Sequence, residues 1–289
     1  MLRRMTQEGL SLLVDEGKQP SLILEAAGDR RMRLRGPKEC FFWARIEEGF
    51  YGVFTLRKGA GPIVVRPIRA QEARKHIDSA WWMHWFADQL ETSACSPLRG
   101  GEWHLTEMVR RPGSRDVLVP KNLDGLPSPA LEIRRTLERP RTTYEDWGSH
   151  GSARTMPLRD PSPLDAGRIK SWIKHAKADT LPPILFWWVS GLDSHLLLDG
   201  HDRLAAALHA GTLPRVLVLW QSLEVPSLDE PDDEFLENYT ALFENPEVNE
   251  LARIQLNAKL VAQHRDTHRR AMTLAKARLI CGRNGTRKC

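Results

Sequence analysis

The sequence predicts an α+β fold, and two observations carry that prediction. Residues 21–68 hold short runs rich in aromatic and β-branched residues, and turn signals separate them, which is typical of antiparallel strands. Residues 165–220 alternate helix-like and strand-like runs, which indicates a mixed α/β layer. We therefore expect a smaller antiparallel α+β domain over residues 1–125, a mixed α/β domain over 126–226 and a helical extension over 227–289.

The composition favours a globular protein of the cytoplasm. Of 289 residues, 41% are hydrophobic and 27% are charged, which is ordinary for a globular chain. No apolar run approaches the roughly 20 residues that a membrane-spanning helix needs. The start MLRRMTQEGLSLLVDEG meets acidic residues before a secretory segment is complete. A cytoplasmic protein without membrane contact is therefore expected.

Two residue types that often bind metals show no metal-binding pattern. The cysteines are scattered and form no CxxC pair, so free thiols in a reducing compartment are expected at Cys40, Cys95, Cys281 and Cys289. His264 and His268 are spaced for one helix face, but no glutamate or third ligand lies near them. We interpret both as surface or packing histidines.

The net charge of +5 is unevenly distributed. Residues 227–250 contain nine acidic residues and no basic one, whereas residues 251–289 contain ten Lys or Arg and only Asp266 as an acid. This basic tail could bind nucleic acid or an acidic partner. The alternative, which we favour, is a solvated helix face whose charge the preceding acidic segment neutralises.

The first part of the chain is predicted as an antiparallel meander followed by a helix. Strands are expected over residues 21–27, 31–35, 40–46, 50–57 and 62–68. From residue 70 to residue 91 the apolar residues recur at helical spacing. Pro- and Gly-rich sequence over 96–129 then predicts loops and the boundary between the two domains.

The predicted helix carries an aromatic cluster of Trp81, Trp82, Trp85 and Phe86. Exposed aromatic side chains could stack on bases or bind another protein. Such clusters more often pack a helix onto a sheet. We favour packing in the core.

The remaining elements follow from periodicity and from helix-ending residues. A helix over 165–178 places Ile169, Trp172, Ile173 and Ala176 on one face. Further elements are expected as strands over 184–190, 195–200 and 215–220 and as helices over 202–211, 235–243 and 247–280. Gly211 is expected to end its helix in a left-handed conformation.

The stretch LLLDGHDRLAAALHAG places a polar cluster between a strand and a helix. The first turn of a helix offers unpaired backbone N–H groups and a partial positive charge, so it can hold a phosphate. Gly200 allows a ligand to approach the backbone, and Arg203 can bind phosphate oxygens in a bidentate manner. The alternative is that Asp199 or Asp202 caps the helix and satisfies the same N–H groups internally.

Residues 150–221 resemble the ParB/sulfiredoxin superfamily in the order of their elements. The matching pieces are a strand with an arginine and prolines (MPLRDPSP), a helix, LPPILFW, a hairpin, the LLLDGHDRLAAALHAG corner and a closing strand. Sulfiredoxins carry Gly-Gly-Cys-His-Arg at the corner, ParB proteins carry Gly-Glu-Arg-Arg, and free-serine kinases carry Asp-Gly-His-His-Arg. The residues 199–203 are most similar to the last. The resemblance implies nucleotide phosphates at this helix start, usually of ATP, ADP or CTP with magnesium.

This sequence departs from these motifs at three positions, and the departures reduce the activities that the resemblance implies. His201 stands where sulfiredoxins have their cysteine, so sulfinic acid reductase activity is not expected. Leu204 stands where ParB proteins have a second arginine, and no ParB-type helix-turn-helix follows, so chromosome partitioning is not expected. Asp202 stands where the kinases have a histidine, which indicates either a metal ligand or a site that has lost its ligand. The resemblance covers neither residues 1–130 nor residues 227–289.

The resemblance also implies roles for the residues of the corner. The backbone from Gly200 to Asp202 and the Arg203 side chain would bind phosphates. Asp199 would hold magnesium or act as a base, Asp202 would be a second magnesium ligand or catalytic carboxylate, and His201 would act as acid or base. Arg159 and Lys170 are either further phosphate contacts or solvated charges.

Three functions fit these observations. The first is an ATP- or ADP-dependent phosphotransferase, or a nucleotide hydrolase. The second is a non-catalytic protein that inhibits or regulates another protein, as an immunity factor does, through the Trp-rich N-terminal domain or the acidic segment. The third and weaker one is a DNA-binding protein or nuclease that uses the basic tail. A solvent-open cleft lined by Asp199, His201 and Arg203 favours an enzyme, whereas engaged side chains there and an exposed acidic or aromatic patch elsewhere favour a binding protein.

Overall fold

The computed structural model describes residues 1–47, 52–75, 78–111, 117–121, 131–146 and 154–224, and short stretches at 237, 240–241, 244–245, 249, 252–253, 269–271 and 276–278. The chain divides into a first unit of Met1–Ser222 with Ala271–Cys289 and a second unit of Leu223–Arg270. The first unit contains helices together with mixed and antiparallel sheets, so the predicted α+β class is confirmed. Within the described part of the chain, no helix is long and apolar enough to cross a membrane.

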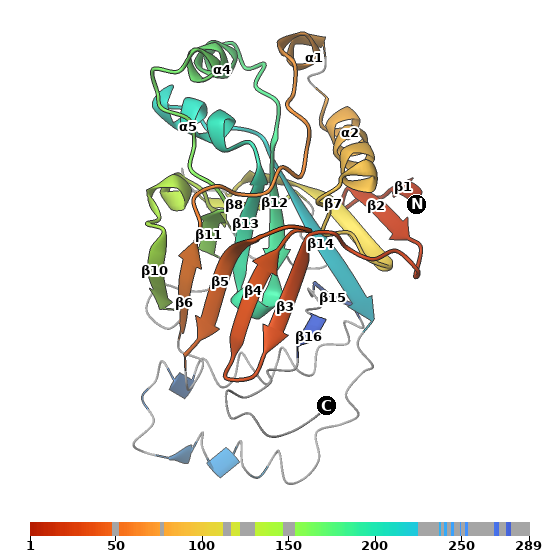
Figure 1. Ribbon diagram of the computed structural model, residues 1–289, viewed down its shortest axis with the longest axis vertical. Helices are drawn as coiled ribbons and strands as arrows, with labels where there is room; N and C mark the ends of the chain where they lie inside the picture. The colour runs from red at the N-terminus through yellow and green to blue at the C-terminus, as the bar shows by residue number, and fades with distance from the viewer. Residues whose placement is uncertain are drawn as a thin grey trace. The chain divides into compact units, whose positions relative to one another are not determined.

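The larger sheet of the first unit, called the mixed sheet below, combines strands from both ends of residues 1–222 (Figure 1). Along the sheet its strands are β1 (Leu2–Met5), β2 (Leu10–Val14), β7 (Gly101–Arg110), β14 (Val216–Glu224), β12 (Ile184–Val189), β13 (Ser194–Asp199) and β11 (Arg154–Pro157). The pairs β12–β14 and β11–β13 are parallel and the other pairs are antiparallel. Two short strands, β8 (Val117–Pro120) and β9 (Leu131–Glu132), continue from β7.

The second sheet, called the meander sheet below, consists of four consecutive antiparallel strands with one further strand paired at each edge. Its strands are β10 (Thr142–Asp146), β6 (Gly52–Arg57), β5 (Cys40–Ile46), β4 (Arg31–Arg35), β3 (Ile23–Ala27) and β16 (Lys276–Arg278), in that order. In β5, Phe42 and Ala44 are buried while Trp43 and Arg45 are exposed. Because side chains alternate between the two faces of a strand, one face of this sheet packs on the core and the other is open to solvent.

Helices cover the ends and faces of the sheets. The α-helices are α1 (Ala70–Lys75), α2 (Ser79–Thr92), α4 (Gly167–Lys177) and α5 (His201–His209), and two 3-10 helices are η1 (Arg134–Glu138) and η2 (Ser190–Leu192). Asp78 caps α2, since its carboxylate accepts a hydrogen bond from the Trp81 backbone N–H at 3.1 Å. Trp82 and Phe86 on this helix are fully buried. Core packing of the aromatic cluster is therefore confirmed.

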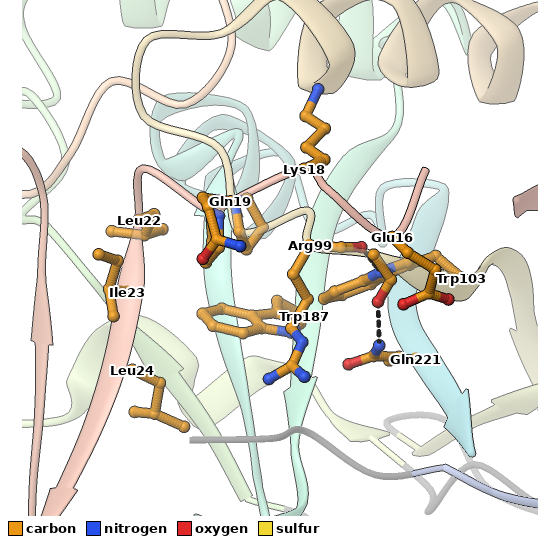
Figure 2. Close-up of a pocket in the computed structure, with 13 residues that line it drawn as sticks. Glu16, Lys18, Gln19, Leu22, Ile23, Leu24, Arg99, Trp103, Trp187 and Gln221 are labelled. Carbon is orange, nitrogen blue, oxygen red and sulfur yellow. Dashed lines mark hydrogen bonds between the residues drawn. The ribbon is translucent and has the colours of Figure 1, made fainter. Parts of the chain in front are cut away.

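A pocket of about 400 Å³ lies where the loop between β2 and β3 meets the mixed sheet (Figure 2). The loop residues Glu16 and Lys18 line one part of it. Trp103 of β7, Trp187 of β12 and Gln221 of β14 line another part. The pocket lies within the first unit.

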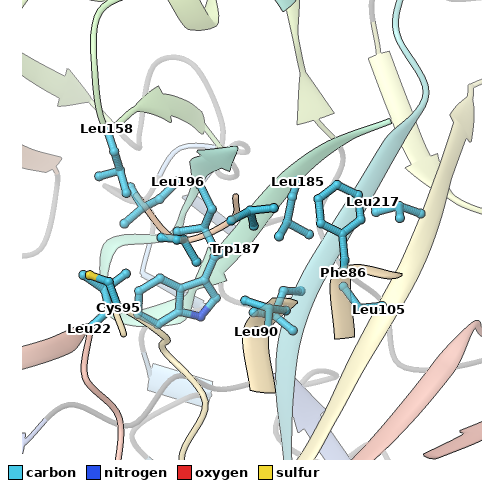
Figure 3. Close-up of a cluster of buried hydrophobic side chains, with 14 of the residues drawn as sticks. Leu22, Phe86, Leu90, Cys95, Leu105, Leu158, Leu185, Trp187, Leu196 and Leu217 are labelled. Carbon is cyan, nitrogen blue, oxygen red and sulfur yellow. The ribbon is translucent and has the colours of Figure 1, made fainter. Parts of the chain in front are cut away.

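The mixed sheet, the meander sheet and α2 share one apolar core (Figure 3). Leu105 of β7, Leu185 of β12 and Leu196 of β13 meet Phe86 and Leu90 of α2 in this core. A second cluster covers the opposite face of β12 and its neighbours. Because both faces are covered, the strand sequence ILFWWV is apolar throughout and does not alternate. Each fully buried large apolar side chain contributes about 1.5–3 kcal/mol to stability.

Most of the predicted elements around the corner are confirmed. Helix α4, the strands β12, β13 and β14 and helix α5 all lie at the predicted places. Gly211 has the expected left-handed φ of 73° after the last turn of α5. The strands β3, β4, β5 and β6 match the first four strands of the predicted meander.

Three predictions for single segments are wrong. Residues 62–68 form no strand, because Pro62 and Pro67 lack the N–H groups of a ladder and the side chains do not alternate in burial. The segment 96–129 is not all loop, because it contains β7, a strand that pairs with β14 and with β2. The helix over 247–280 is interrupted by β15 (Arg269–Ala271) and by β16, which pairs with β3 and forms the edge of the meander sheet.

Other predictions fall on residues that the structure describes only in part. Helical backbone at residues 237, 240–241 and 252–253 agrees with the two helices predicted there. His264, His268, Cys281, Cys289 and most of the basic tail lie outside the described residues. Cys40 and Cys95 are free thiols, and burial raises the pKa of Cys95 to about 11.

His195 on β13 is a fully buried histidine without a hydrogen-bond partner among the residues that the structure describes. It is 0% exposed, neither ring nitrogen has a partner there, and the rings of Phe186 and Trp188 pack around it. Burial lowers the pKa of His195 to about 3. Between about pH 6.5 and pH 3, the ring of His195 is therefore neutral in the folded protein. The same ring binds a proton in the unfolded chain over this range.

This histidine makes folding sensitive to acid. An unfolded histidine binds its proton below about pH 6.5, so stability falls as the pH falls below that value. In urea unfolding, we expect the free energy of unfolding to fall between pH 7 and pH 5 by about 2 kcal/mol less in His195→Leu than in the wild type. At pH 7 the variant should be at least as stable, because leucine buries no unpaired polar atom. If the free energy of unfolding changes with pH in the same way in the two proteins, this contradicts a neutral, buried His195.

Candidate functional site

The polar corner lies where β13 ends and α5 begins. Gly200 has a φ of 97°, a left-handed conformation that a side chain disfavours. A Cβ atom on Gly200 would lie 2.5 Å from Cγ2 of Ile184 on β12. The glycine is thus required by the backbone conformation and by close packing against the neighbouring strand.

Asp199 and Arg203 form a buried ion pair at this corner. Arg203 is 2% exposed, and its Nη2 atom donates to a carboxylate oxygen of Asp199 at 2.6 Å and to the backbone oxygen of Pro183 at 3.0 Å. A buried guanidinium is costly unless an acid and hydrogen-bond acceptors compensate it. The guanidinium group predicted to bind phosphate is therefore engaged with the chain itself.

Asp202, on the first turn of α5, binds the segment that follows β11. Its carboxylate accepts a hydrogen bond from the backbone N–H of Ser162 at 2.8 Å and one from the Ser162 hydroxyl at 3.2 Å. The Nε atom of Arg168, at the start of α4, lies 3.3 Å from the same carboxylate. Asp202 therefore connects α5 with two segments that precede it in the chain.

His201 is fully buried against Arg159. The Nε atom of Arg159 lies 3.1 Å from Nδ1 of the imidazole, and the Arg159 backbone N lies 3.3 Å from Nε2. Burial, together with the positive charges of Arg159, Arg203 and Arg57, holds the pKa of His201 well below its ordinary value. A neutral imidazole has only one acceptor nitrogen, so it can satisfy only one of the two donors.

The segment 158–162 lies over the corner and is held from its other side as well. Asp160 bonds to Arg57 and to Arg141, and its backbone N–H donates to the oxygen of Gly59 at 2.9 Å. Burial alone would raise the pKa of Asp160, but the two arginines hold it below its ordinary value. The covering segment is thus tied both to α5 and to the end of the meander sheet.

The structure brings together most of the residues that the sequence singled out. Asp199, Gly200, His201, Asp202 and Arg203 lie at one corner, with Arg159 against it. Lys170 on α4 is exposed, and no hydrogen bond or ion pair among the described residues joins it to the corner.

Sequence reasoning missed four residues that hold this corner: Ser162, Arg168, Arg57 and Arg141. Ser162 and Arg168 lie in or next to the MPLRDPSP segment, which was singled out for its arginine and prolines. A serine between two prolines and an arginine at a helix start were the signals that could have indicated them. Arg57 and Arg141 come from distant strands, and the sequence gives no sign of their proximity.

The carboxylates at the corner do not fit a magnesium site. Asp199 faces Arg203, whereas Asp202 faces Ser162 and Arg168, so each acid already has its own positive partner. In the described ranges, no group of three or more His, Cys, Asp or Glu side chains is placed to hold a metal ion. Magnesium prefers several oxygen ligands around one point, and this corner does not supply them.

Comparison of the chain with models of protein families, with characterised proteins and with solved structures finds no match. The resemblance to the ParB/sulfiredoxin superfamily stays a prediction.

Removing the charge of Asp199 tests the buried ion pair. In Asp199→Asn the Arg203 guanidinium stays buried without its counter-charge, so we expect the free energy of unfolding to fall by about 3–5 kcal/mol in urea titrations. Adding Arg203→Met to this variant should recover part of the loss, because an apolar side chain needs no partner. The exposed Asp165→Asn serves as control and should change stability by no more than about 0.5 kcal/mol. Equal stability of Asp199→Asn and the control contradicts the role of the pair.

Proposed function

We propose that this chain is a non-catalytic binding protein, with a ParB/sulfiredoxin-like layer as its scaffold, that inhibits or regulates a partner protein. One observation carries the proposal: the residues of the polar corner are at most 8% exposed, and their side chains bind other residues of the chain itself. A catalytic acid, base or nucleophile must come within hydrogen-bond reach of its substrate. Side chains engaged in this way support a structural role for the corner.

An exposed apolar surface elsewhere supports the binding role. It lies on the solvent face of the meander sheet and consists of Trp43, Phe54, Leu56 and Tyr144, which are 37%, 51%, 48% and 41% exposed. We call these residues the aromatic patch. Trp43 is directly opposite Leu56 and Phe54 is directly opposite Tyr144 in the sheet register. The rings of Phe54 and Tyr144 are 4.6 Å apart, so the patch is continuous.

The aromatic side chains of the patch favour a protein as its partner. Large exposed side chains that gather on one face commonly mark a protein interface, and aromatic residues supply much of the binding energy there. On the same sheet Arg33 and Arg35 both pair with Glu25, and Arg31 pairs with Asp29. Arg45 lies directly opposite Phe54 and adds a positive charge beside the patch, so the preference for a protein rests on the aromatic side chains and not on the charge.

Disrupting the aromatic patch tests the proposal. We expect Phe54→Ser with Tyr144→Ser to abolish capture of the partner from a lysate of the source cells. With the purified partner we expect the Kd to rise at least about 30-fold and stoichiometric inhibition of its activity to be lost. The control is Leu2→Ser with Leu13→Ser, an exposed apolar cross-strand pair on β1 and β2, which should behave as the wild type.

Two results contradict this function. One is capture of the same amount of partner by both double variants. The other is that Phe54→Ser with Tyr144→Ser loses self-association in sedimentation velocity but still binds the partner. The aromatic patch would then join two copies of the chain.

A second candidate function, nucleotide-phosphate binding by a phosphotransferase or nucleotide hydrolase, has its own supporting observations. No side chain of the described residues caps the first turn of α5, so its backbone N–H groups can donate hydrogen bonds to an anion. Arg159 has no carboxylate partner among the described residues, and His201 cannot accept from both of its donors. An anion that displaced Arg159 from the imidazole would relieve that conflict.

Calorimetry with ATP, ADP and CTP, with and without Mg²⁺, tests this candidate. If phosphates bind at the corner, Arg159→Gln should weaken binding about tenfold, because a charged hydrogen bond is lost. Lys177→Gln, an exposed change on α4, should bind as the wild type does. Release of phosphate from ATP would show that the chain also hydrolyses the nucleotide. Absence of heat with all three nucleotides at millimolar concentration excludes the candidate and leaves the binding protein.

A further inference from the structure

The aromatic patch borders two exposed arginines on the open face of the meander sheet. Arg45 of β5 lies directly opposite Phe54 of the patch on β6, and directly opposite Arg31 on β4, its other neighbouring strand (Figure 1). Both arginine side chains are exposed. Neighbouring strands are only about 4.8 Å apart. The open face therefore changes from apolar to basic within the width of one or two strands.

The pairing of Arg31 with Arg45 disfavours the sheet. Two like charges directly opposite each other destabilise a pair of strands. Arg31 has a salt bridge to Asp29 at 3.1 Å. Arg45 has no hydrogen bond or ion pair among the described residues. An exposed guanidinium without a partner, next to a second positive charge, favours an anionic group from outside the chain.

The other arginines on this face are already neutralised. Arg33 and Arg35 of β4 both donate through their Nε atoms to the carboxylate of Glu25 on β3. The positive charge that is open to a partner therefore belongs to Arg45, with Arg31 beside it. Such a small charge at one side of the aromatic patch matches one or two carboxylates.

The packing of the patch favours protein side chains over the bases of a nucleic acid. The ring centroids of Phe54 and Tyr144 are 4.6 Å apart, and the ring planes are tilted by 41°. Successive bases stack on separate aromatic faces, whereas these two rings cover each other in part. Leu56, opposite Trp43, adds an aliphatic side chain that is 48% exposed. A mixed surface of this kind suits apolar side chains of a protein segment.

From these features, and on the premise of the proposed function, we infer that the partner protein presents an acidic, amphipathic segment to this face. Its apolar side chains lie against Phe54, Leu56 and Tyr144. A carboxylate beside them binds the Arg45 guanidinium, and a second acid within reach binds Arg31. The aromatic patch supplies most of the affinity, and the two arginines select a partner of negative charge.

Two synthetic peptides that differ only in charge test this partner chemistry. Both carry the same Leu and Phe residues on one face of an amphipathic helix, and the flanking positions carry Glu in one peptide and Lys in the other. Fluorescence anisotropy of the labelled peptides measures their affinity for the full chain. We expect the Glu peptide to bind at least about tenfold more tightly than the Lys peptide. Equal affinity for both peptides, or no saturable binding of the Glu peptide, overturns the inference.

Variants then assign the preference to the two arginines. In Arg31→Glu with Arg45→Glu, we expect the Lys peptide to bind more tightly than the Glu peptide. The milder Arg45→Gln leaves the Arg31 salt bridge in place and should weaken binding of the Glu peptide about tenfold. The control Arg4→Gln with Arg110→Gln removes two exposed arginines of the mixed sheet and should bind as the wild type does. An unchanged preference in Arg45→Gln and in the charge-reversed variant overturns the inference.

The purified partner separates this inference from the proposed function. If Phe54→Ser with Tyr144→Ser loses the partner but Arg45→Gln binds it with the wild-type Kd, the proposed function stands and the acidic segment is wrong. If both variants keep the wild-type Kd, the proposed function itself is wrong. Tighter binding of single-stranded oligothymidylate than of the Glu peptide also overturns the inference, because the face would then bind nucleic acid.

Discussion

The buried charge of Arg203 is the constraint on which the corner depends. A guanidinium that is 2% exposed must have an acid beside it, and Asp199 at the end of β13 supplies that acid. The pair joins the end of β13 to the first turn of α5. Once α5 is fixed, His201 and Asp202 on its first turn point toward the segment 158–162 and bind it. A short polar motif thus connects a strand, a helix and a covering segment.

The chemistry of this corner is that of a closed electrostatic network. Asp199, Asp202 and Asp160 each face at least one arginine, and those arginines come from several elements. His201 lies among these positive charges and stays neutral because of them and because of its burial. Similar residues in an open cleft would supply acid, base and metal ligands. Here their hydrogen bonds join parts of one chain.

Local patterns in the sequence predicted much of the fold. Strand β5 coincides with the predicted strand, because aromatic and β-branched residues fit a half-buried pleated surface. Residues 62–68 have a similar composition but contain prolines, whose missing N–H groups prevented pairing. Strand β7 was missed because glycines and prolines surround it, and its pairing with β14 joins segments more than a hundred residues apart. Strand–Gly–helix geometry at Gly200 could be predicted, and Arg159 was singled out as a possible neighbour of the corner. Arg57 of β6 and Arg141 could not be predicted, since only tertiary contacts bring them there.

The ring of His201 offers the most direct measurement of whether the corner is closed by the chain itself. Its two ¹⁵N chemical shifts, followed by NMR from pH 8 to pH 5 with and without ATP, report protonation and access together. We expect the shifts of a neutral imidazole throughout this range, unchanged by ATP, because burial and three arginines disfavour the proton. Titration near pH 6.5, or a shift when ATP is added, would show an open corner and contradict closure by the chain itself.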